Sequence, residues 1–253
     1  MIPIHVFEGK TVALFGLGLS GIASARALRT GGAKVQAWDD AQASRAAARS
    51  QGIDSVDLEQ IDWNICAALI LAPGVPLTHP EPHWVVKQAQ AAGVEIIGDT
   101  ELFFRERKRL GSKARVVAIT GTNGKSTTAA LTAHVLNSGG LKASLGGNIG
   151  TAILDLPPFS DTHVYVIEFS SYQVDLTPGL EADAAALINI TPDHLDRHGT
   201  LDNYAAVKAR IFSGLKEGGL AAIGADDAHC RAVAQTLDGP FDVAQVSVRE
   251  RVA

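Results

Sequence analysis

The sequence predicts an α/β protein in which two parallel-sheet units follow one another along the chain. Short apolar runs alternate with stretches that have helical spacing, which is typical of βαβ units and a buried parallel sheet. The alternation starts near residue 11 and restarts near residue 115, after a basic and polar stretch. Each start is a strand, a glycine-rich turn and a helix. In a parallel sheet such a turn is the place where an anion binds.

The first unit is expected to span 1–111. Its predicted strands cover 11–15, 34–38, 67–72 and 94–97, and its predicted helices cover 20–30, 41–50 and 82–92. Pro82 at the start of the last helix and Gly93 after its end fit the usual capping asymmetry. A linker is expected over 105–113, where the composition turns basic and polar.

The second unit is expected to span 112–253. Its predicted strands cover 115–120, 164–169, 185–190, 219–223 and 243–248, and its predicted helices cover 125–137, 202–213 and 226–236. Because the last segment still reads as a strand, we expect this unit to be incomplete at its C-terminal end.

Composition excludes several classes of protein. The 253 residues are 46% hydrophobic, which is enough for one large domain or two ordinary ones. The net charge is −5 and the one dense basic run is 105–109, so a nucleic-acid surface is not expected. Two distant cysteines give no disulfide framework or zinc pattern. No signal peptide or membrane-spanning run is evident, so we expect a cytoplasmic protein.

The second glycine-rich turn predicts a phosphate-binding loop. Glycines let successive N–H groups turn inward, a lysine reaches the β- and γ-phosphates, and a Ser or Thr hydroxyl binds Mg²⁺. The general form of this loop has a glycine six residues before its lysine, where this chain has Ile119. An ordinary strand-to-helix turn with a solvated lysine is the alternative. The candidate ATP-binding residues are Gly121, Thr122, Asn123, Gly124, Lys125, Ser126 and Thr127.

The first glycine-rich turn, GLGLSG at 16–21, indicates a second nucleotide site. It follows a predicted strand, opens a helix, and is followed by Asp39 at about the separation of a ribose-binding acid. Such a pattern is typical of a Rossmann-like domain. It predicts a binding site for a nucleoside diphosphate but does not identify the base. An NAD-dependent oxidoreductase and a purely structural turn are both compatible with it.

Acidic and histidine side chains follow the strands of the second unit. Glu168 ends one predicted strand and His194 comes just after another, so both are expected at the edge that carries Ser126. We interpret the three as candidate Mg²⁺ ligands. Asp193 and Asp196 are more typical of turns or caps. Lys208, between apolar helical residues, has by residue type the pattern of a solvated or snorkelling side chain.

Taken in order, these motifs resemble those of the Mur ligase family. GTNGKS/T followed by DHLD is specific for the family, and the early motifs are similar to those of its D-glutamate-adding members. The matching segments are GLGLSG (16–21), APGVPLTHP (72–80), GDTELF (98–103), ITGTNGKST (119–127), GGNIG (146–150), EFSSYQ (168–173), NITPDHLDRHG (189–199) and YAAVKARIF (204–212).

The resemblance implies a Rossmann-like domain that binds the UDP of UDP-N-acetylmuramoyl-L-alanine, followed by a truncated P-loop Mur-ligase central domain that binds ATP. The C-terminal domain of the family would be absent, and with it the D-glutamate site. The residues implied for the UDP-substrate are Leu19, Ser20, Asp39, Gly74 and Asn148.

The resemblance also implies roles in catalysis. Ser126 and Glu168 would bind one Mg²⁺ and His194 a second, and Lys208 matches the lysine that the family carbamylates. A carbamate turns that cation into an anion able to help bind Mg²⁺, which replaces the solvated interpretation. Together with Lys125, these groups would support ATP-dependent addition of D-glutamate through an acyl phosphate, in cytoplasmic peptidoglycan synthesis. The chain alone would be inactive.

Two other functions stay open at this point. An NAD-dependent oxidoreductase would explain GLGLSG and Asp39 but leaves GTNGKST without a role. A regulatory P-loop module would bind ATP without forming an amide.

Overall fold

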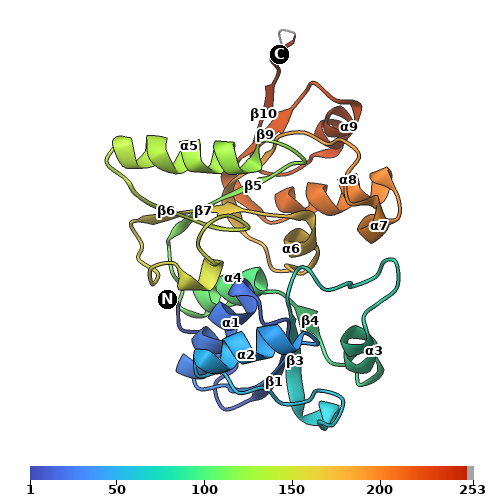
Figure 1. The fold of residues 1–253 in the computed structure, drawn as a ribbon. Helices are drawn as coiled ribbons and strands as arrows, with labels where there is room; N and C mark the ends of the chain where they lie inside the picture. The colour runs from blue at the N-terminus through green and yellow to red at the C-terminus, as the bar shows by residue number, and fades with distance from the viewer. Residues whose placement is uncertain (250–253) are drawn as a thin grey trace. The chain divides into compact units, whose positions relative to one another are not determined.

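The computed structural model describes residues 1–249 and divides them into two compact units (Figure 1). The first consists of Met1–Gly111 with two short segments, Ala152–Pro158 and Leu176–Pro178, and the second contains the other described residues. Every strand pair in both sheets is parallel, so the predicted α/β fold with two parallel sheets is confirmed. No helix in the described part is long and apolar enough to cross a bilayer.

The first unit has one sheet with the strand order β2-β1-β3-β4. A core cluster that includes Phe15, Leu69 and Val86 packs against it. The strands are β1 (Thr11–Phe15), β2 (Lys34–Trp38), β3 (Cys66–Leu71) and β4 (Ile96–Ile97). The helices are α1 (Leu19–Thr30), α2 (Gln42–Ser50), α3 (Trp84–Ala91) and α4 (Asp99–Arg109), with short 3-10 turns η1 (Trp63–Ile65) and η2 (Ile153–Asp155).

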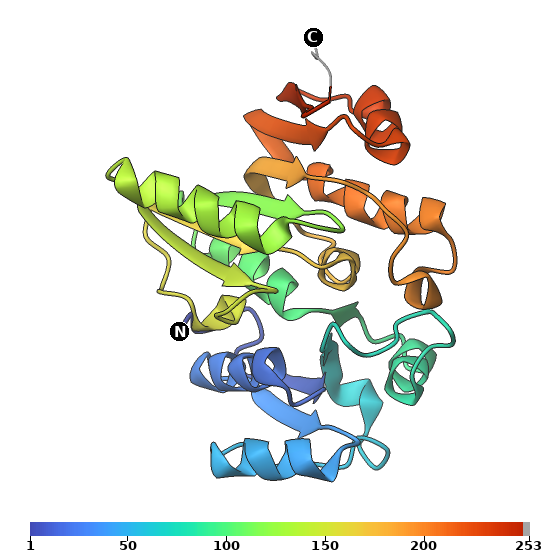
Figure 2. The same ribbon diagram turned by 45° about the horizontal axis from the view of Figure 1, so that its top comes forward.

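The second unit has the strand order β10-β9-β8-β5-β7-β6 (Figure 2). Helix α5 packs on β5, β6 and β7, and α9 packs on β9. The strands are β5 (Arg115–Thr120), β6 (Lys142–Gly147), β7 (His163–Glu168), β8 (Ala182–Leu187), β9 (Leu215–Gly224) and β10 (Asp242–Val246). The helices are α5 (Lys125–Ser138), α6 (Ser171–Asp175), α7 (Leu195–His198), α8 (Leu201–Ala209), the 3-10 turn η3 (Arg210–Phe212) and α9 (Ala228–Thr236).

The expected linker over 105–113 was wrong for most of its length, because helix α4 continues to Arg109. Acidic residues lie in its first turn and basic residues in its last, which complements the helix dipole. Glu106 and Arg107 are buried, so the basic run belongs to the core side of a helix as well as to the surface.

Some bounds and elements also differ from the prediction. Helix α3 starts at Trp84 because the ring of His83 caps it, with Nδ1 accepting from the N–H of Val85 at 3.4 Å. Strand β8 ends at Leu187, three residues before the end of the predicted strand. Strand β6 was not predicted, since KASLGG has little apolar periodicity and ends in two glycines. The short helices α6 and α7 were also missed.

The strand register brings the functional motifs of the second unit to one edge of its sheet. Ile119 of β5 pairs with Glu168 of β7, which in turn pairs with Gly147 of β6. Thr120 of β5 pairs with Leu187 of β8. The segments that follow these strands therefore leave the same carboxyl edge, where parallel α/β sheets bind ligands.

The N-terminal segment of the first unit is fastened by a buried carboxylate. Glu106 Oε2 accepts hydrogen bonds from the N–H groups of His5 at 2.8 Å and Val6 at 3.2 Å. Its Oε1 accepts from Arg109 Nη2 at 2.6 Å and lies 3.1 Å from His5 Nδ1. Burial acts to raise the pKa of Glu106, but the hydrogen bonds from Arg109 and His5 outweigh it, so the pKa lies below its usual range.

We predict that Glu106→Gln destabilises the first unit by about 1–3 kcal/mol at neutral pH, since the new NH2 group must face either Arg109 or the N–H groups of His5 and Val6, all of which are donors. The three tryptophans, Trp38, Trp63 and Trp84, all lie in this unit, so urea unfolding followed by tryptophan fluorescence reports on it alone.

The same variant should change the pH dependence of stability. A lowered folded-state pKa gives stability that is present above the unfolded-state pKa and is lost as the pH falls through the folded-state value. The difference in the free energy of unfolding between wild type and Glu106→Gln should therefore become smaller at acidic pH. Glu59→Gln, at an exposed position, is the control. A difference equal to that control, or one that grows in acid, contradicts the assignment.

Candidate active site

The phosphate loop has the backbone conformation that its glycines allow. Gly121 has φ +157° and Gly124, directly before α5, has φ +80°. A Cβ on Gly121 would lie 3.1 Å from Cβ of Ile188, so the loop packs closely against the segment after β8. Residues that have a side chain rarely adopt the left-handed backbone conformation of Gly124. The two glycines therefore allow the tight turn after which α5 begins with Lys125 and Ser126.

The loop is fastened to the segment that follows β8. The N–H of Thr122 donates to the Asn189 backbone oxygen at 2.9 Å, and the N–H of Asn123 donates to Asn189 Oδ1 at 2.9 Å. Thr122 Oγ1 accepts from the N–H of Thr191 at 3.0 Å and lies 3.3 Å from the hydroxyl oxygen of Tyr204. The sequence analysis missed Asn189 as a functional candidate. That analysis placed Asn189 inside the predicted strand 185–190, whereas β8 ends at Leu187.

Ser126, which is exposed, and Glu168, which is buried, form a pair of oxygen donors beside the loop. Ser126 Oγ donates to Glu168 Oε2 at 2.8 Å, and Asn148 Nδ2 donates to Glu168 Oε1 at 2.9 Å. Glu168 is 1% exposed. Lys125 Nζ donates to the Thr122 carbonyl oxygen at 2.7 Å, so the ammonium lies back on the loop. The structure thus brings together five residues that the sequence singled out.

This donor set fits Mg²⁺, which prefers oxygen ligands and is usually bound through one or two carboxylates, waters and substrate phosphates. Within residues 1–249, no cluster of three or more His, Cys, Asp or Glu side chains could bind a metal without a substrate. An ion at Ser126 and Glu168 would take its remaining ligands from phosphate and water.

Lys208 is buried under the loop. It is 1% exposed, and its Nζ donates to the Gly121 carbonyl oxygen at 2.8 Å and to Thr120 Oγ1 at 3.3 Å. Its ammonium lies 4.7 Å from the ring centroid of Tyr204. Burial, followed by the charge of Lys125, lowers the pKa of Lys208 to about 7. The solvated interpretation based on residue type was therefore wrong.

His194 lies in a separate aromatic cluster after the loop-binding segment. It has φ +52°, and its ring centroid is 5.2 Å from that of Tyr172 and 6.5 Å from that of Tyr204. Its Nε2 is 3.4 Å from Asp193 Oδ2. The side chain is 48% exposed, which leaves the imidazole accessible to a ligand.

The same cluster contains His198, which the sequence analysis did not single out. His198 is buried, stacks on Tyr172 with centroids 5.5 Å apart, and has its Nε2 2.8 Å from Ser171 Oγ. Burial is the main cause that lowers the pKa of His198.

The glycine turn of the first unit is equally constrained. Gly16 has φ +97°, and a Cβ there would overlap that of Ala72; a Cβ on Gly21 would overlap the Gly16 carbonyl oxygen. Asp39 Oδ2 accepts from the N–H of Leu17 at 2.8 Å, and its Oδ1 accepts from that of Ala41 at 2.8 Å. Asp39 therefore fastens the turn to the end of β2.

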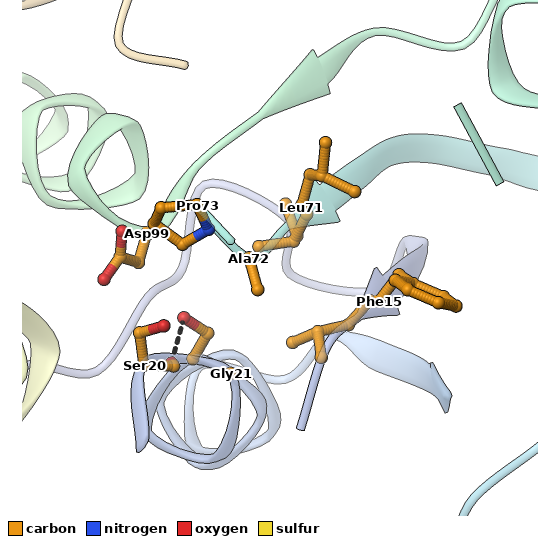
Figure 3. Close-up of a pocket in the computed structure, with 10 residues that line it drawn as sticks. Phe15, Ser20, Gly21, Leu71, Ala72, Pro73 and Asp99 are labelled. Atoms are coloured by element: carbon orange, nitrogen blue, oxygen red, sulfur yellow. Dashed lines mark hydrogen bonds between the residues drawn. The ribbon is translucent and has the colours of Figure 1, made fainter. Parts of the chain in front are cut away.

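Three candidate UDP residues surround this turn. Leu19 is 83% exposed at the start of α1, and Gly74 is exposed after β3. Ser20 lines a small cavity of about 10 Å³ together with Pro73 and Asp99 (Figure 3). That volume is room for about one water molecule, so the cavity supports the turn rather than receiving a nucleotide.

A larger cavity lies beside the phosphate loop. It has a volume of about 550 Å³ and is lined by residues from the loop, from the segment after β8 and from the ends of β9 and β10. Asn123 and Asn189 lie at its polar side, and Ile188, Ile223 and Val246 form apolar wall. The second unit thus has a pocket, open to solvent on one side, next to its glycine turn.

Fold and site together define a parallel-sheet α/β protein in which a glycine turn joins a strand to a helix that begins with a lysine and a serine. The sequence pattern of the Mur ligase middle domain matches residues 119–252, which is more than half of the chain. The chain belongs to the Mur ligase family.

Similar proteins agree with this assignment. A UDP-N-acetylmuramoylalanine--D-glutamate ligase of Chelativorans sp. (strain BNC1) is 58% identical over 239 residues, which are 94% of this chain and 50% of that protein. One of Bradyrhizobium diazoefficiens is 54% identical over 254 residues, covering 100% of this chain and 54% of that protein. The chain therefore spans about half the length of these curated relatives.

A solved structure supports the fold. The crystal structure of UDP-N-acetylmuramate:L-alanyl-gamma-D-glutamyl-meso-diaminopimelate ligase from Neisseria meningitides superposes with a TM-score of 0.61 at 19% identity, covering 93% of this chain and 77% of that chain.

We predict that Gly147→Ala destabilises the second unit, because a Cβ there would overlap the Glu168 carbonyl oxygen. Gly150→Ala is the matched control: it lies in the same GGNIG segment with φ +60° and has nothing within 4 Å of its Cβ position. Gly147→Ala should cost about 1–3 kcal/mol more than the control.

All three tyrosines lie in the second unit, so thermal unfolding followed by their near-UV signal measures this difference. Equal effects of the two substitutions would show that the approach of Gly147 to Glu168 does not constrain the site.

Proposed function

We propose that the chain is the UDP-substrate-binding and ATP-binding portion of a cytoplasmic ligase that adds D-glutamate to UDP-N-acetylmuramoyl-L-alanine in peptidoglycan synthesis. The observation that carries the proposal is the hydrogen bond between Ser126 and Glu168 beside Lys125, at the carboxyl edge of a parallel sheet. It is the arrangement expected for a metal-bound triphosphate. The names of relatives at 54–58% identity support the choice of substrates.

ATP would bind with its phosphates at the loop and the first turn of α5. The first N–H groups of a helix have no acceptor inside the helix, and the helix dipole favours an anion there. Lys125 would leave the Thr122 carbonyl oxygen and reach the phosphates. The 550 Å³ cavity, which begins at Asn123, is large enough for the nucleoside. Mg²⁺ at Ser126 and Glu168 would supply positive charge against the phosphate oxygens.

The proposed chemistry has two steps. The alanyl carboxylate attacks the γ-phosphorus of ATP, which gives an acyl phosphate and releases ADP. The amine of D-glutamate then attacks the acyl carbon, an amide bond forms, and inorganic phosphate leaves. Phosphoryl transfer depends mainly on positioning and charge neutralisation, which are what Lys125 and its neighbours provide.

The first unit, 1–111, is proposed as the UDP-binding domain and 112–253 as the ATP-binding domain. Leu19, Ser20, Asp39 and Gly74 would contact or shape the UDP site, and the exposed positions of Leu19 and Gly74 are consistent with ligand contact. Asn148 would contact the substrate as well as Glu168.

Because the curated relatives are about twice as long, we expect D-glutamate binding and ligation to need residues outside this chain. The oxidoreductase alternative has no support among the relatives, whose printed names are those of ligases.

The direct test is phosphate release by the full-length protein with ATP, UDP-N-acetylmuramoyl-L-alanine and one candidate amino acid at a time. We predict stimulation by D-glutamate above all others. Lys125→Ala should lower the rate by about 10²–10³-fold, as the loss of one electrostatic group at the reacting centre does. Lys142→Ala, at an exposed position of β6, should leave it unchanged. ATP binding without any amino-acid-dependent phosphate release would favour a regulatory module instead.

Lys208 and His194 are proposed to assist at a second Mg²⁺, Lys208 as its carbamate. Carbamylation joins the neutral amine to CO₂ and releases a proton, so it needs the unprotonated form. With a pKa of about 7, the neutral fraction of Lys208 rises as the pH increases through that value.

We therefore predict that ¹³C-labelled CO₂, held at constant concentration, gives a carbamate NMR signal that grows with pH. Most of the increase should fall between about pH 6 and about pH 8, on either side of the pKa of Lys208. Lys208→Ala should abolish the signal. A signal of the same size in that variant, or none in the wild type at any pH, would exclude the modification.

A further inference from the structure

The side-chain amide of Asn189 both accepts and donates hydrogen bonds with the backbone of the phosphate loop. Its Oδ1 accepts from the N–H of Asn123 at 2.9 Å and from that of Thr122 at 3.2 Å, and its Nδ2 donates to the Asn123 carbonyl oxygen at 3.1 Å. The amide therefore satisfies three backbone groups of the loop with one side chain. The bond from the N–H of Thr122 is partly buried, where an unpaired donor is costly, and the three bonds together favour a single loop conformation.

These hydrogen bonds divide the loop into two parts. The N–H groups of Thr122 and Asn123 point to Asn189 and are thereby taken from any phosphate. The N–H groups of Lys125, Ser126 and Thr127 belong to the first turn of α5 and precede its first hydrogen bond, which the N–H of Thr128 donates to the Gly124 carbonyl oxygen at 3.0 Å. Thr122 and Asn123 would then shape the loop, and the residues after Gly124 would contact the anion.

The segment that carries Asn189 is joined to the loop at a second point. Thr122 Oγ1 donates to the Thr191 carbonyl oxygen at 3.2 Å and accepts from its N–H at 3.0 Å. His194 follows three residues later. The position of the loop and the start of the His194 segment are thus linked through one short stretch of chain.

We propose that Asn189 is a positioning residue for ATP: it keeps the loop in the conformation that receives the triphosphate, without touching the nucleotide's phosphates itself. This inference rests on the proposed function, which puts ATP at the loop. Without the clamp, the loop would spend only part of its time in the binding conformation, and the apparent affinity falls in proportion to that fraction.

The chain offers a matched control for a purely structural role. Asn137, at the other end of α5, also makes three hydrogen bonds to backbone groups: Nδ2 to the carbonyl oxygens of Ala133 at 2.8 Å and Ala143 at 3.0 Å, and Oδ1 from the N–H of Ala143 at 3.1 Å. Its removal should disturb the fold to a similar degree, but not the loop.

The test is the affinity of the full-length protein for Mg²⁺–ATP, measured by isothermal titration calorimetry for wild type, Asn189→Ala and Asn137→Ala. We expect Asn189→Ala to weaken binding about tenfold or more, which corresponds to a binding-competent loop population of about a tenth. Affinity for the UDP-substrate should be unchanged in both variants. The proposal is overturned if Asn189→Ala binds ATP like the wild type, or if Asn137→Ala weakens it equally.

Hydrogen exchange of the loop, without nucleotide, supplies a second readout that does not depend on activity. Asn189→Ala should speed exchange in the peptide that contains Thr122 and Asn123, and Asn137→Ala should not. Unchanged exchange in Asn189→Ala would also overturn the clamp. A different result would contradict the proposed function alone: Asn189→Ala weakens ATP binding as predicted, and yet the full-length wild type releases no phosphate with D-glutamate.

Discussion

The burial of one carboxylate at the carboxyl edge of the second sheet constrains the surrounding site. Glu168 ends β7 and is almost fully buried, so its charge needs partners, and Ser126 and Asn148 supply them. Each partner comes from a different segment, one from the first turn of α5 and one from the turn after β6. The close approach of Gly147 to the Glu168 backbone keeps that second turn in place. A buried acid thereby fixes the position of two elements around a space suited to a cation and phosphates.

Each of the two glycine turns is held in place by one side chain that hydrogen-bonds to its backbone, but the side chains differ in charge. In the first unit an acid, Asp39, accepts two backbone N–H groups and fastens the turn to the neighbouring strand. In the second unit a neutral amide, Asn189, does the corresponding work and adds a donor for a carbonyl group. A neutral clamp suits a loop that is to receive a triphosphate, because it adds no negative charge beside the ligand. Lys208, which is buried, donates to the Gly121 carbonyl oxygen of the same loop.

Much of the fold was predictable, because most strands are short apolar runs bounded by turn residues and both glycine turns follow such a run. The misses have physical causes. Strand β6, at a sheet edge, lacks apolar periodicity, and the end of α4 was interpreted as a linker because its residues 105–109 are nearly all charged. At the site, Ser126 and Glu168 could be placed together from strand ends alone. Asn189 could not, since its role depends on hydrogen bonds between segments about 66 residues apart, which no local pattern encodes.

The central claim is that a metal-bound triphosphate is held at the second glycine turn, between the lysine after it and the buried acid of β7. A crystal structure of the full-length protein with Mg²⁺ and a non-hydrolysable ATP analogue tests it most directly. We predict phosphate oxygens within hydrogen-bonding reach of Lys125 and a metal ion bound by Ser126 and Glu168. A triphosphate elsewhere in the protein, or a metal bound without either oxygen ligand, would contradict it.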